Sequence, residues 1–185
     1  MAEADDQDAA TLELSPQQIM DVVQSALATG AAAIEQGDMD GAEQVFRSIL
    51  EIDPGNADAC NGLAVAFSGK GDLTGAERFL KRAVELDSGN SQYHRNLGFV
   101  YAGRNRLKRA GRALAEAVRL DPADVEAHYR LAWVQRARGD MPGFIEHLQV
   151  IISIDADHAL ANNDLGCYMA QQGDLDQAQV YLRQG

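Results

Sequence analysis

The sequence predicts an all-α protein built as a solenoid of antiparallel helix pairs, and three observations support that prediction. Helix-ending residues recur at a constant interval, as from Gly37 to Gly71 and from Gly139 to Gly173. A second series of breaks has the same interval in a different phase, so each period contains two helices. Aromatic residues make up only 6% of the 185 residues, whereas Ala and Gly are abundant, which favours helices that pack closely through small side chains. Two helices per period indicate a helical repeat array.

The first series of breaks predicts the turn inside each helix pair. Gly readily takes the left-handed conformation that ends a helix, and the Asp after it can cap the next helix. In the third period, Asn105 and Arg106 replace the Gly-Asp pair. The second series predicts the end of each second helix, because Pro disfavours helical geometry in the residue before it. The first series is Gly37-Asp38, Gly71-Asp72, Gly139-Asp140 and Gly173-Asp174; the second is Ile52-Asp53-Pro54, Leu86-Asp87-Ser88, Leu120-Asp121-Pro122 and Ile154-Asp155-Ala156.

The segment before the periodic part is expected to contain a tail and a helical extension. Residues 1–14 are predicted to form a short disordered acidic tail, and their acidic start does not fit a secretory signal. Order is expected to begin at Ser15, with Pro16 at the first helical position and Gln18 completing a capping box, so residues 15–22 are predicted as an N-terminal helical extension. No stretch of the sequence approaches the roughly 18 apolar residues that cross a bilayer, so no membrane insertion is expected.

Small and bulky residues recur at fixed positions of the 34-residue unit when repeats start at residues 23, 57, 91, 125 and 159. Position 7 is assigned to Gly30, Leu63, Leu97, Leu131 and Leu165; position 8 to Ala31, Ala64, Gly98, Ala132 and Gly166; position 20 to Ala42, Ala76, Ala110, Phe144 and Ala178; position 24 to Phe46, Leu80, Leu114, Leu148 and Leu182. This pattern resembles the tetratricopeptide repeat (TPR) family. The resemblance covers residues 23–185 and implies a TPR array, a right-handed superhelical solenoid. The repeats are 23–56, 57–90, 91–124, 125–158 and 159–185, the last of them truncated.

Two features depart from the family pattern. Phe144 takes the place of a small residue at position 20, so its ring is expected either to be accommodated as a core aromatic or to change the local curvature of the solenoid. The fifth repeat stops at its position 27 without the polar capping helix that usually ends such an array. The sequence therefore predicts either a piece of a longer protein or an end face covered by another subunit, with a homo-oligomer formed through that uncapped repeat.

The search for chemistry gives no catalytic constellation, so neither enzymatic activity nor a cofactor is expected. The stretch from Ser68 to Gly71 lacks the first Gly and the Ser/Thr of a phosphate loop. Repeat position 4 holds two His, but equivalent positions in adjacent repeats are on the order of 10 Å apart, so packing rather than a metal site is expected there. The two cysteines form no C-x-x-C pair and suit a reducing, cytoplasmic location. The position-4 residues are Cys60, His94, His128 and Asn162; the residues without a companion at ligand spacing are His147, His158 and Cys167.

The charge is unevenly distributed along the chain. The net charge is -12, which argues against a uniform nucleic-acid-binding surface. Residues 91–138 nevertheless carry ten bases and four acids. A basic patch is predicted at the turn and second helix of repeat 3, either as a solvated face or as a site for an acidic protein partner or the chain's own acidic tail. Its residues are Arg104, Arg106, Lys108, Arg109 and Arg112.

The TPR resemblance also implies an inner groove lined by positions 2, 5, 9 and 12 of each first helix. There, Phe99, Tyr129 and Trp133 beside Arg95 and Arg136 have the composition of a binding hot spot, with aromatic anchors and cations at the rim. Of the carboxylate clamp that some family members use for chaperone tails, only two residues match, and of the backbone-binding Asn ladder only one matches, so neither mode is supported. The matching residues are Asn96 and Arg130. Position 5 of repeats 2 and 5 places two further polar residues in the groove, Asn61 and Asn163.

The leading functional interpretation is a non-enzymatic interaction scaffold or adaptor that binds a peptide or helix in the groove. The partner is expected to be a protein or peptide with apolar anchors and acidic character, not a nucleic acid. Two alternatives remain open: the N-terminal targeting domain of a larger enzyme of glycosyltransferase or methyltransferase type, and a bacterial secretion chaperone. The Ala, Gly and Arg usage is typical of a bacterial protein.

Overall fold

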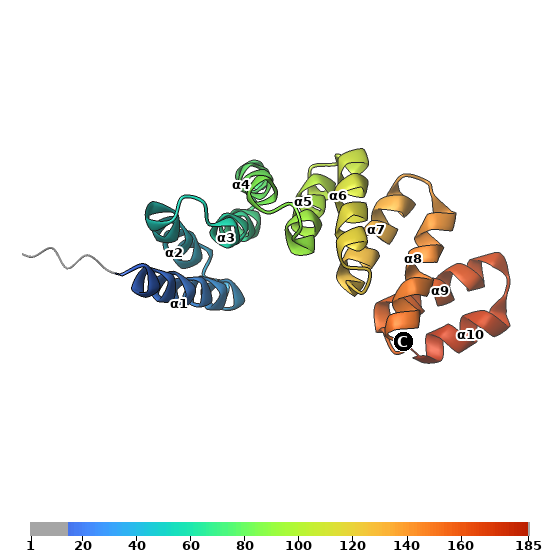
Figure 1. The fold of residues 1–185 in the computed structure, drawn as a ribbon. Helices are drawn as coiled ribbons and strands as arrows, with labels where there is room; N and C mark the ends of the chain where they lie inside the picture. The colour runs from blue at the N-terminus through green and yellow to red at the C-terminus, as the bar shows by residue number, and fades with distance from the viewer. Residues whose placement is uncertain (1–14, 185) are drawn as a thin grey trace, which may run out of the picture.

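The computed structural model describes residues 15–184, which form ten helices and no strand within that range. The helices stack in antiparallel pairs along a curved array, with α1 at one end and α10 at the other (Figure 1). The predicted acidic tail, residues 1–14, lies outside the described residues. The helices are α1 (Pro16–Glu35), α2 (Met39–Ile52), α3 (Ala57–Gly69), α4 (Leu73–Leu86), α5 (Ser91–Gly103), α6 (Leu107–Leu120), α7 (Val125–Ala137), α8 (Met141–Ile154), α9 (Ala159–Gln172) and α10 (Leu175–Gln184).

The first helix begins where its capping residues predict. The backbone N–H of Gln18 donates to Ser15 Oγ at 3.3 Å, and the backbone N–H of Ser15 donates to Gln18 Oε1 at 2.8 Å. Pro16 occupies the first turn, where its missing N–H needs no partner. The predicted capping box is therefore confirmed, and α1 runs from it without a break to Glu35.

The turns inside the helix pairs have the predicted conformation. Gly37, Gly71, Gly139 and Gly173 have φ between +78° and +86°, a region that a side chain disfavours. Asn105 takes the same role with φ 56°, consistent with the tolerance of Asn for the left-handed region. The Asp after each Gly accepts a hydrogen bond from the first turn of the next helix, whereas Arg106 provides no side-chain cap for α6.

Close packing within each helix pair depends on the small residue at position 8. A β-carbon placed on Gly98 would lie 2.5 Å from Leu114 Cγ, and one placed on Gly30 would lie 2.5 Å from the Phe46 ring. The assignment of Ala31 to this position was wrong: Gly30 is buried under Phe46, whereas Ala31 is exposed. In the repeats that have Gly at position 8, the position-24 side chain therefore occupies the space that a β-carbon would need.

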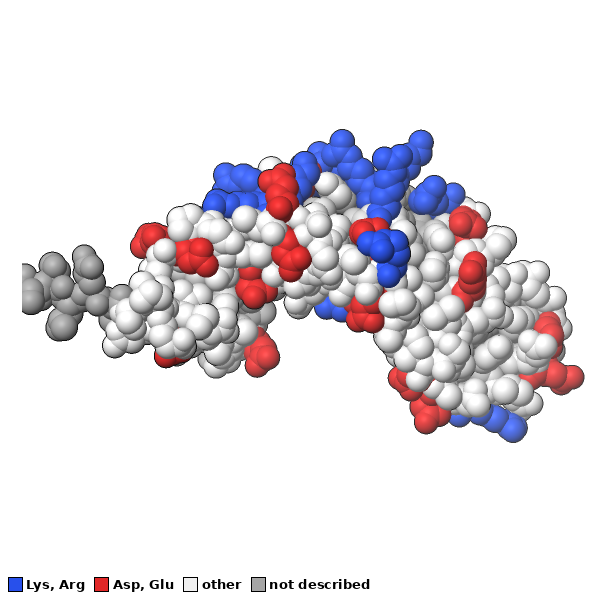
Figure 2. Space-filling view, viewed as in Figure 1, with Lys and Arg blue, Asp and Glu red and all other residues white. Residues whose placement is uncertain are grey.

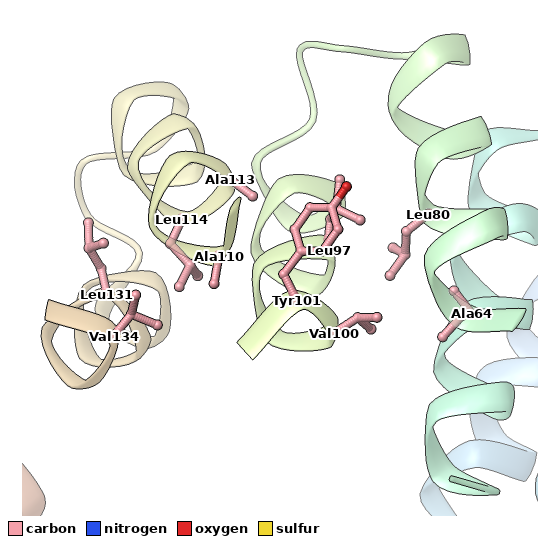
Figure 3. Close-up of a cluster of buried hydrophobic side chains, with 11 residues drawn as sticks. Ala64, Leu80, Leu97, Val100, Tyr101, Ala110, Ala113, Leu114, Leu131 and Val134 are labelled. Carbon is pink, nitrogen blue, oxygen red and sulfur yellow. The ribbon is translucent and has the colours of Figure 1, made fainter. Parts of the chain in front are cut away.

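The core is continuous through the middle of the array. Leu80, Leu97, Leu114 and Leu131, from four consecutive helices, belong to one buried cluster (Figure 3). Such stacking buries an apolar stripe that a single repeat cannot bury alone. Phe144 is 1% exposed, so this ring is a core aromatic, the first of the two outcomes expected for it.

The last helix has a less complete apolar environment. Leu175, Val180 and Leu182 in α10 are 69%, 57% and 47% exposed, respectively. Only Ala178 is buried in this helix. Within residues 15–184, no helix combines the length and the hydropathy needed to span a bilayer.

Candidate functional site

An apolar opening lies between α5 and α7, the first helices of repeats 3 and 4. It has a volume of 410 Å³, and we call it the aromatic cleft. Phe99 and Trp133 stand at this opening with 45% and 42% of their surfaces exposed, so two large aromatic side chains are available to a ligand at one place. The cleft is lined by Phe99, Ala102, Leu107, Leu114, Glu126, Tyr129, Arg130, Trp133, Val134 and Ala137.

Neighbouring side chains fix the orientation of Trp133. The ring of Tyr129 meets it nearly edge-on at a centroid distance of 6.4 Å, and the buried ring of Phe144 does so at 6.0 Å. The Tyr129 hydroxyl donates to Asp164 at 3.0 Å, and burial raises the pKa of that hydroxyl. The guanidinium of Arg136 lies 4.8 Å from the Trp133 ring. A rigid, half-exposed aromatic ring of this kind loses little conformational entropy on binding.

The cations near the aromatic cleft are largely neutralised. Arg95 Nη1 lies 2.8 Å from Asp124 Oδ2, and Arg130 Nη2 lies 2.6 Å from Glu126 Oε1 while its guanidinium covers the Phe99 ring at 4.4 Å. From the sequence, both residues are candidate residues of the binding groove. Arg95 is therefore committed to Asp124 and does not supply an unpaired charge to the cleft.

The predicted polar groove residues are divided between buried and exposed positions. Asn61 is 9% exposed, contrary to the expectation of an exposed groove residue. The physical reason is its partner, because Asn96 Nδ2 donates to Asn61 Oδ1 at 2.8 Å across the two neighbouring repeats. Asn163 is exposed on α9, and Arg136 is exposed on α7.

The predicted basic patch is only partly unpaired. Lys and Arg gather along the outer edge of the curved array, over α4 and α6, whereas acidic side chains are scattered over the rest of this face (Figure 2). Glu77 is 7% exposed. Its carboxylate forms ion pairs with Arg104 at 2.8 Å and with Arg106 at 2.7 Å. Two of the five predicted patch residues thus share one carboxylate, which also pairs with Lys81. Lys108, Arg109 and Arg112 are exposed on α6.

The residues at repeat position 4 have a structural role. His94 Nε2 lies 3.0 Å from Ser88 O, His128 Nε2 lies 3.1 Å from Pro122 O, and Asn162 Nδ2 donates to Ala156 O at 2.8 Å. Each bond satisfies a backbone carbonyl in the turn that precedes the helix. Cys60 makes no such bond, and a guanidinium from the next helix, that of Arg82, donates to the corresponding Pro54 carbonyl. At His94, His128 and Asn162 the position-4 side chain therefore ties its helix to the preceding turn.

One histidine expectation was wrong. His147 has a companion, because its Nδ1 lies 2.9 Å from Nδ1 of His128. Burial, together with the neighbouring His128, lowers the pKa of His147. The two residues belong to α7 and α8 and are 19 positions apart, a separation that has no simple repeat relation. No cluster of three or more metal-ligating residues occurs among residues 15–184.

Comparisons with known proteins agree with this architecture. Two sequence profiles described as tetratricopeptide repeat match residues 33–97 and 95–159. They cover more than half of the chain between them, so the chain belongs to the tetratricopeptide repeat family. A comparison with curated protein sequences gave no significant match.

Solved structures of several repeat proteins are similar to this chain. MamA is 26% identical with a TM-score of 0.74, over 84% of this chain and 91% of that one. The protein pilF of Pseudomonas aeruginosa is 21% identical with a TM-score of 0.85, over 90% and 76%. YrrB, described as a TPR protein with an unusual peptide-binding site, is 18% identical with a TM-score of 0.68, over 90% and 89%. At these identities, the similarities to pilF and YrrB establish the shared fold.

Proposed function

We propose that this protein is an interaction scaffold that binds an apolar segment of a partner, a peptide or a helix, in the aromatic cleft. The observation that supports the proposal best is the half-exposed pair Phe99 and Trp133 at the mouth of a 410 Å³ cleft. Large aromatic side chains that are rigid and central in a recess are the usual anchors of protein interfaces. The YrrB description, a TPR protein with a peptide-binding site, is consistent with such a role for this fold.

The contacts around the cleft favour apolar burial over charge as the source of affinity. Arg95 and Arg130 have carboxylate partners, and Arg136 lies over the Trp133 ring. A ligand would therefore meet the faces and edges of rings with paired charges around them. Burying the exposed parts of two such rings contributes on the order of 2 kcal/mol of binding free energy each. Arg136 gives a modest preference for an acidic residue beside the anchor.

The test is capture of partners by the purified chain carrying Trp133→Ala, Phe99→Ala or both. Each single substitution is expected to weaken capture by roughly 10-fold, because it removes an anchor worth more than about 1.4 kcal/mol. Tyr129 is left unchanged, since its hydroxyl bonds Asp164 and its loss would also disturb the support of Trp133.

The control is Leu86→Ala, which removes a side chain of similar exposure, 44%, at a position outside the cleft. Capture should be unchanged in this variant, and helicity should be unchanged in all of them. Equal capture by the wild type and by the double variant, with intact helicity, would reject the cleft as the binding site.

A further inference from the structure

An ion pair between a partly exposed cation and a buried carboxylate links consecutive repeats at two junctions along the array. Between repeats 1 and 2, Glu43 of α2 forms an ion pair with Lys70 at 2.8 Å. Between repeats 2 and 3, Glu77 of α4 forms an ion pair with Arg104 at 2.8 Å. Glu43 and Glu77 are one repeat period apart, as are Lys70 and Arg104. The two carboxylates are 8% and 7% exposed, so each fills a groove beside the second helix of its repeat.

The junction between repeats 3 and 4 has the cation of this pair without the carboxylate. Gly111 stands one period after Glu77, and Arg138 stands one period after Arg104. The guanidinium of Arg138 lies over Gly111, because a β-carbon on Gly111 would be 3.3 Å from Arg138 Nη1. Within residues 15–184, no carboxylate lies within ion-pair distance of Arg138.

This junction has a recess lined by Gly111 and Arg138. Its volume is 590 Å³, and no Asp or Glu is among its lining residues. Lys108 and Arg112 of α6 stand beside Arg138 at this recess, and all three are exposed. We call it the cationic socket. Its lining residues are Lys108, Gly111, Arg112, Ala115, Val118, Leu131, Gln135, Arg138 and His147.

We propose that the cationic socket binds an aspartate or glutamate side chain in an acidic segment of a partner protein, at the place that Glu43 and Glu77 occupy in the earlier junctions. A carboxylate is the group that the two equivalent grooves already hold against a Lys or Arg at position 14. A guanidinium with two further cations in a recess favours an anion by charge complementarity. This site is separate from the aromatic cleft and does not depend on the function proposed for it.

The test uses a fluorescein-labelled oligoglutamate peptide and a matched oligoglutamine peptide, with fluorescence anisotropy at low ionic strength. Oligoglutamate should bind and oligoglutamine should not. Gly111→Glu supplies the missing carboxylate from within the chain, so it should weaken binding by roughly 10-fold. Arg138→Ala should weaken binding by at least about threefold. Gly111→Glu is expected to fold, because the nearest atom is the mobile end of Arg138.

Two controls separate the socket from general charge and from steric blocking. Gly111→Gln introduces a side chain of the same size without charge and should retain most of the binding. Arg109→Ala removes one positive charge from an exposed residue of the same helix outside the socket, and it should change binding by less than Arg138→Ala does.

Three outcomes would overturn the proposal. Equal losses in Gly111→Gln and Gly111→Glu would show that blocking, not charge, abolishes binding. Equal losses in Arg109→Ala and Arg138→Ala would show a diffuse electrostatic effect. Binding of a synthetic peptide of residues 1–14 at least about 10-fold tighter than oligoglutamate would assign the socket to the chain's own acidic segment instead of a partner.

Discussion

The junction between repeats 2 and 3 and the junction between repeats 3 and 4 have the same helical framework but different surfaces. At the first, the Glu77 carboxylate pairs with Lys81, Arg104 and Arg106 beside an opening of 980 Å³, and Asn61 bonds Asn96. The second has the aromatic cleft of 410 Å³ on one side and the cationic socket of 590 Å³ on another. The two junctions therefore differ in the charge of the groups that line their openings: Glu77 lines the first, whereas no Asp or Glu lines the cationic socket.

At the socket, two residues lose size or charge in one period. Gly111 replaces the glutamate found one period earlier, and Ala115 replaces Lys81. On the side of the cleft, Ala102 and Ala137 line the opening next to the exposed rings.

The largest effect expected from this comparison is that of Glu77→Ala at the junction between repeats 2 and 3. The substitution leaves Lys81, Arg104 and Arg106 without their shared carboxylate, and it should lower the free energy of unfolding by about 3 kcal/mol. Urea unfolding followed by circular dichroism measures the change. Glu85→Ala, an exposed position of the same helix, should stay within about 0.5 kcal/mol of the wild type; a similar loss there would contradict the assigned role of Glu77.

A smaller effect should distinguish the glycines of the third repeat. Gly111→Ala fits the open socket and should stabilise the chain by about 0.5 to 1 kcal/mol, because Ala is the better helix former. Gly98→Ala brings a methyl group to 2.5 Å from Leu114 Cγ and should destabilise it by about 1 kcal/mol or more. Thermal unfolding of both variants provides the comparison, and a change of the same sign in both would be inconsistent with the difference in packing.

The smallest effect is a dependence of stability on pH at the His128–His147 contact. Burial and His128 lower the pKa of His147 from its ordinary value of 6.5. The folded state therefore binds fewer protons than the unfolded state just below pH 6.5, so this contribution to stability is complete above that pH and decreases as the pH falls. Urea midpoints measured across this range for the wild type and His147→Gln should show a weaker pH dependence in the variant. Identical pH dependence in the two proteins would show that His147 does not contribute.

The fold could be predicted from the sequence, because turn residues such as Gly71 and Asn105 and the 34-residue period are local signals. The position-8 residue of the first repeat was assigned one residue too far along the chain, because small residues follow Gly30 directly. Gly30 stands two whole periods before Gly98, so strict use of the period would have corrected it.

The site was predicted less completely. The exposure of Phe99 and Trp133 follows from helical periodicity and could be foreseen. The pairing of Arg95 with Asp124 joins α5 to the residue that caps α7, 29 residues along the chain, and depends on side-chain conformations that the sequence pattern does not specify. The loss of a carboxylate at Gly111 has a signal in the sequence, since the residues one and two periods earlier are both Glu, but its meaning depends on the ion pairs seen in the structure.

The most direct test of partner binding at the junction between repeats 3 and 4 is site-specific photocrosslinking at two equivalent positions. A benzophenone side chain is placed at Ala102, which lines the aromatic cleft, or at Ser68, which stands one period earlier in repeat 2. Both residues are half-buried, so their access to a ligand is comparable. Crosslinking of a captured partner from Ala102 and not from Ser68 is the predicted result. Equal crosslinking from both positions, or crosslinking from Ser68 alone, would contradict the assignment of partner binding to the junction between repeats 3 and 4.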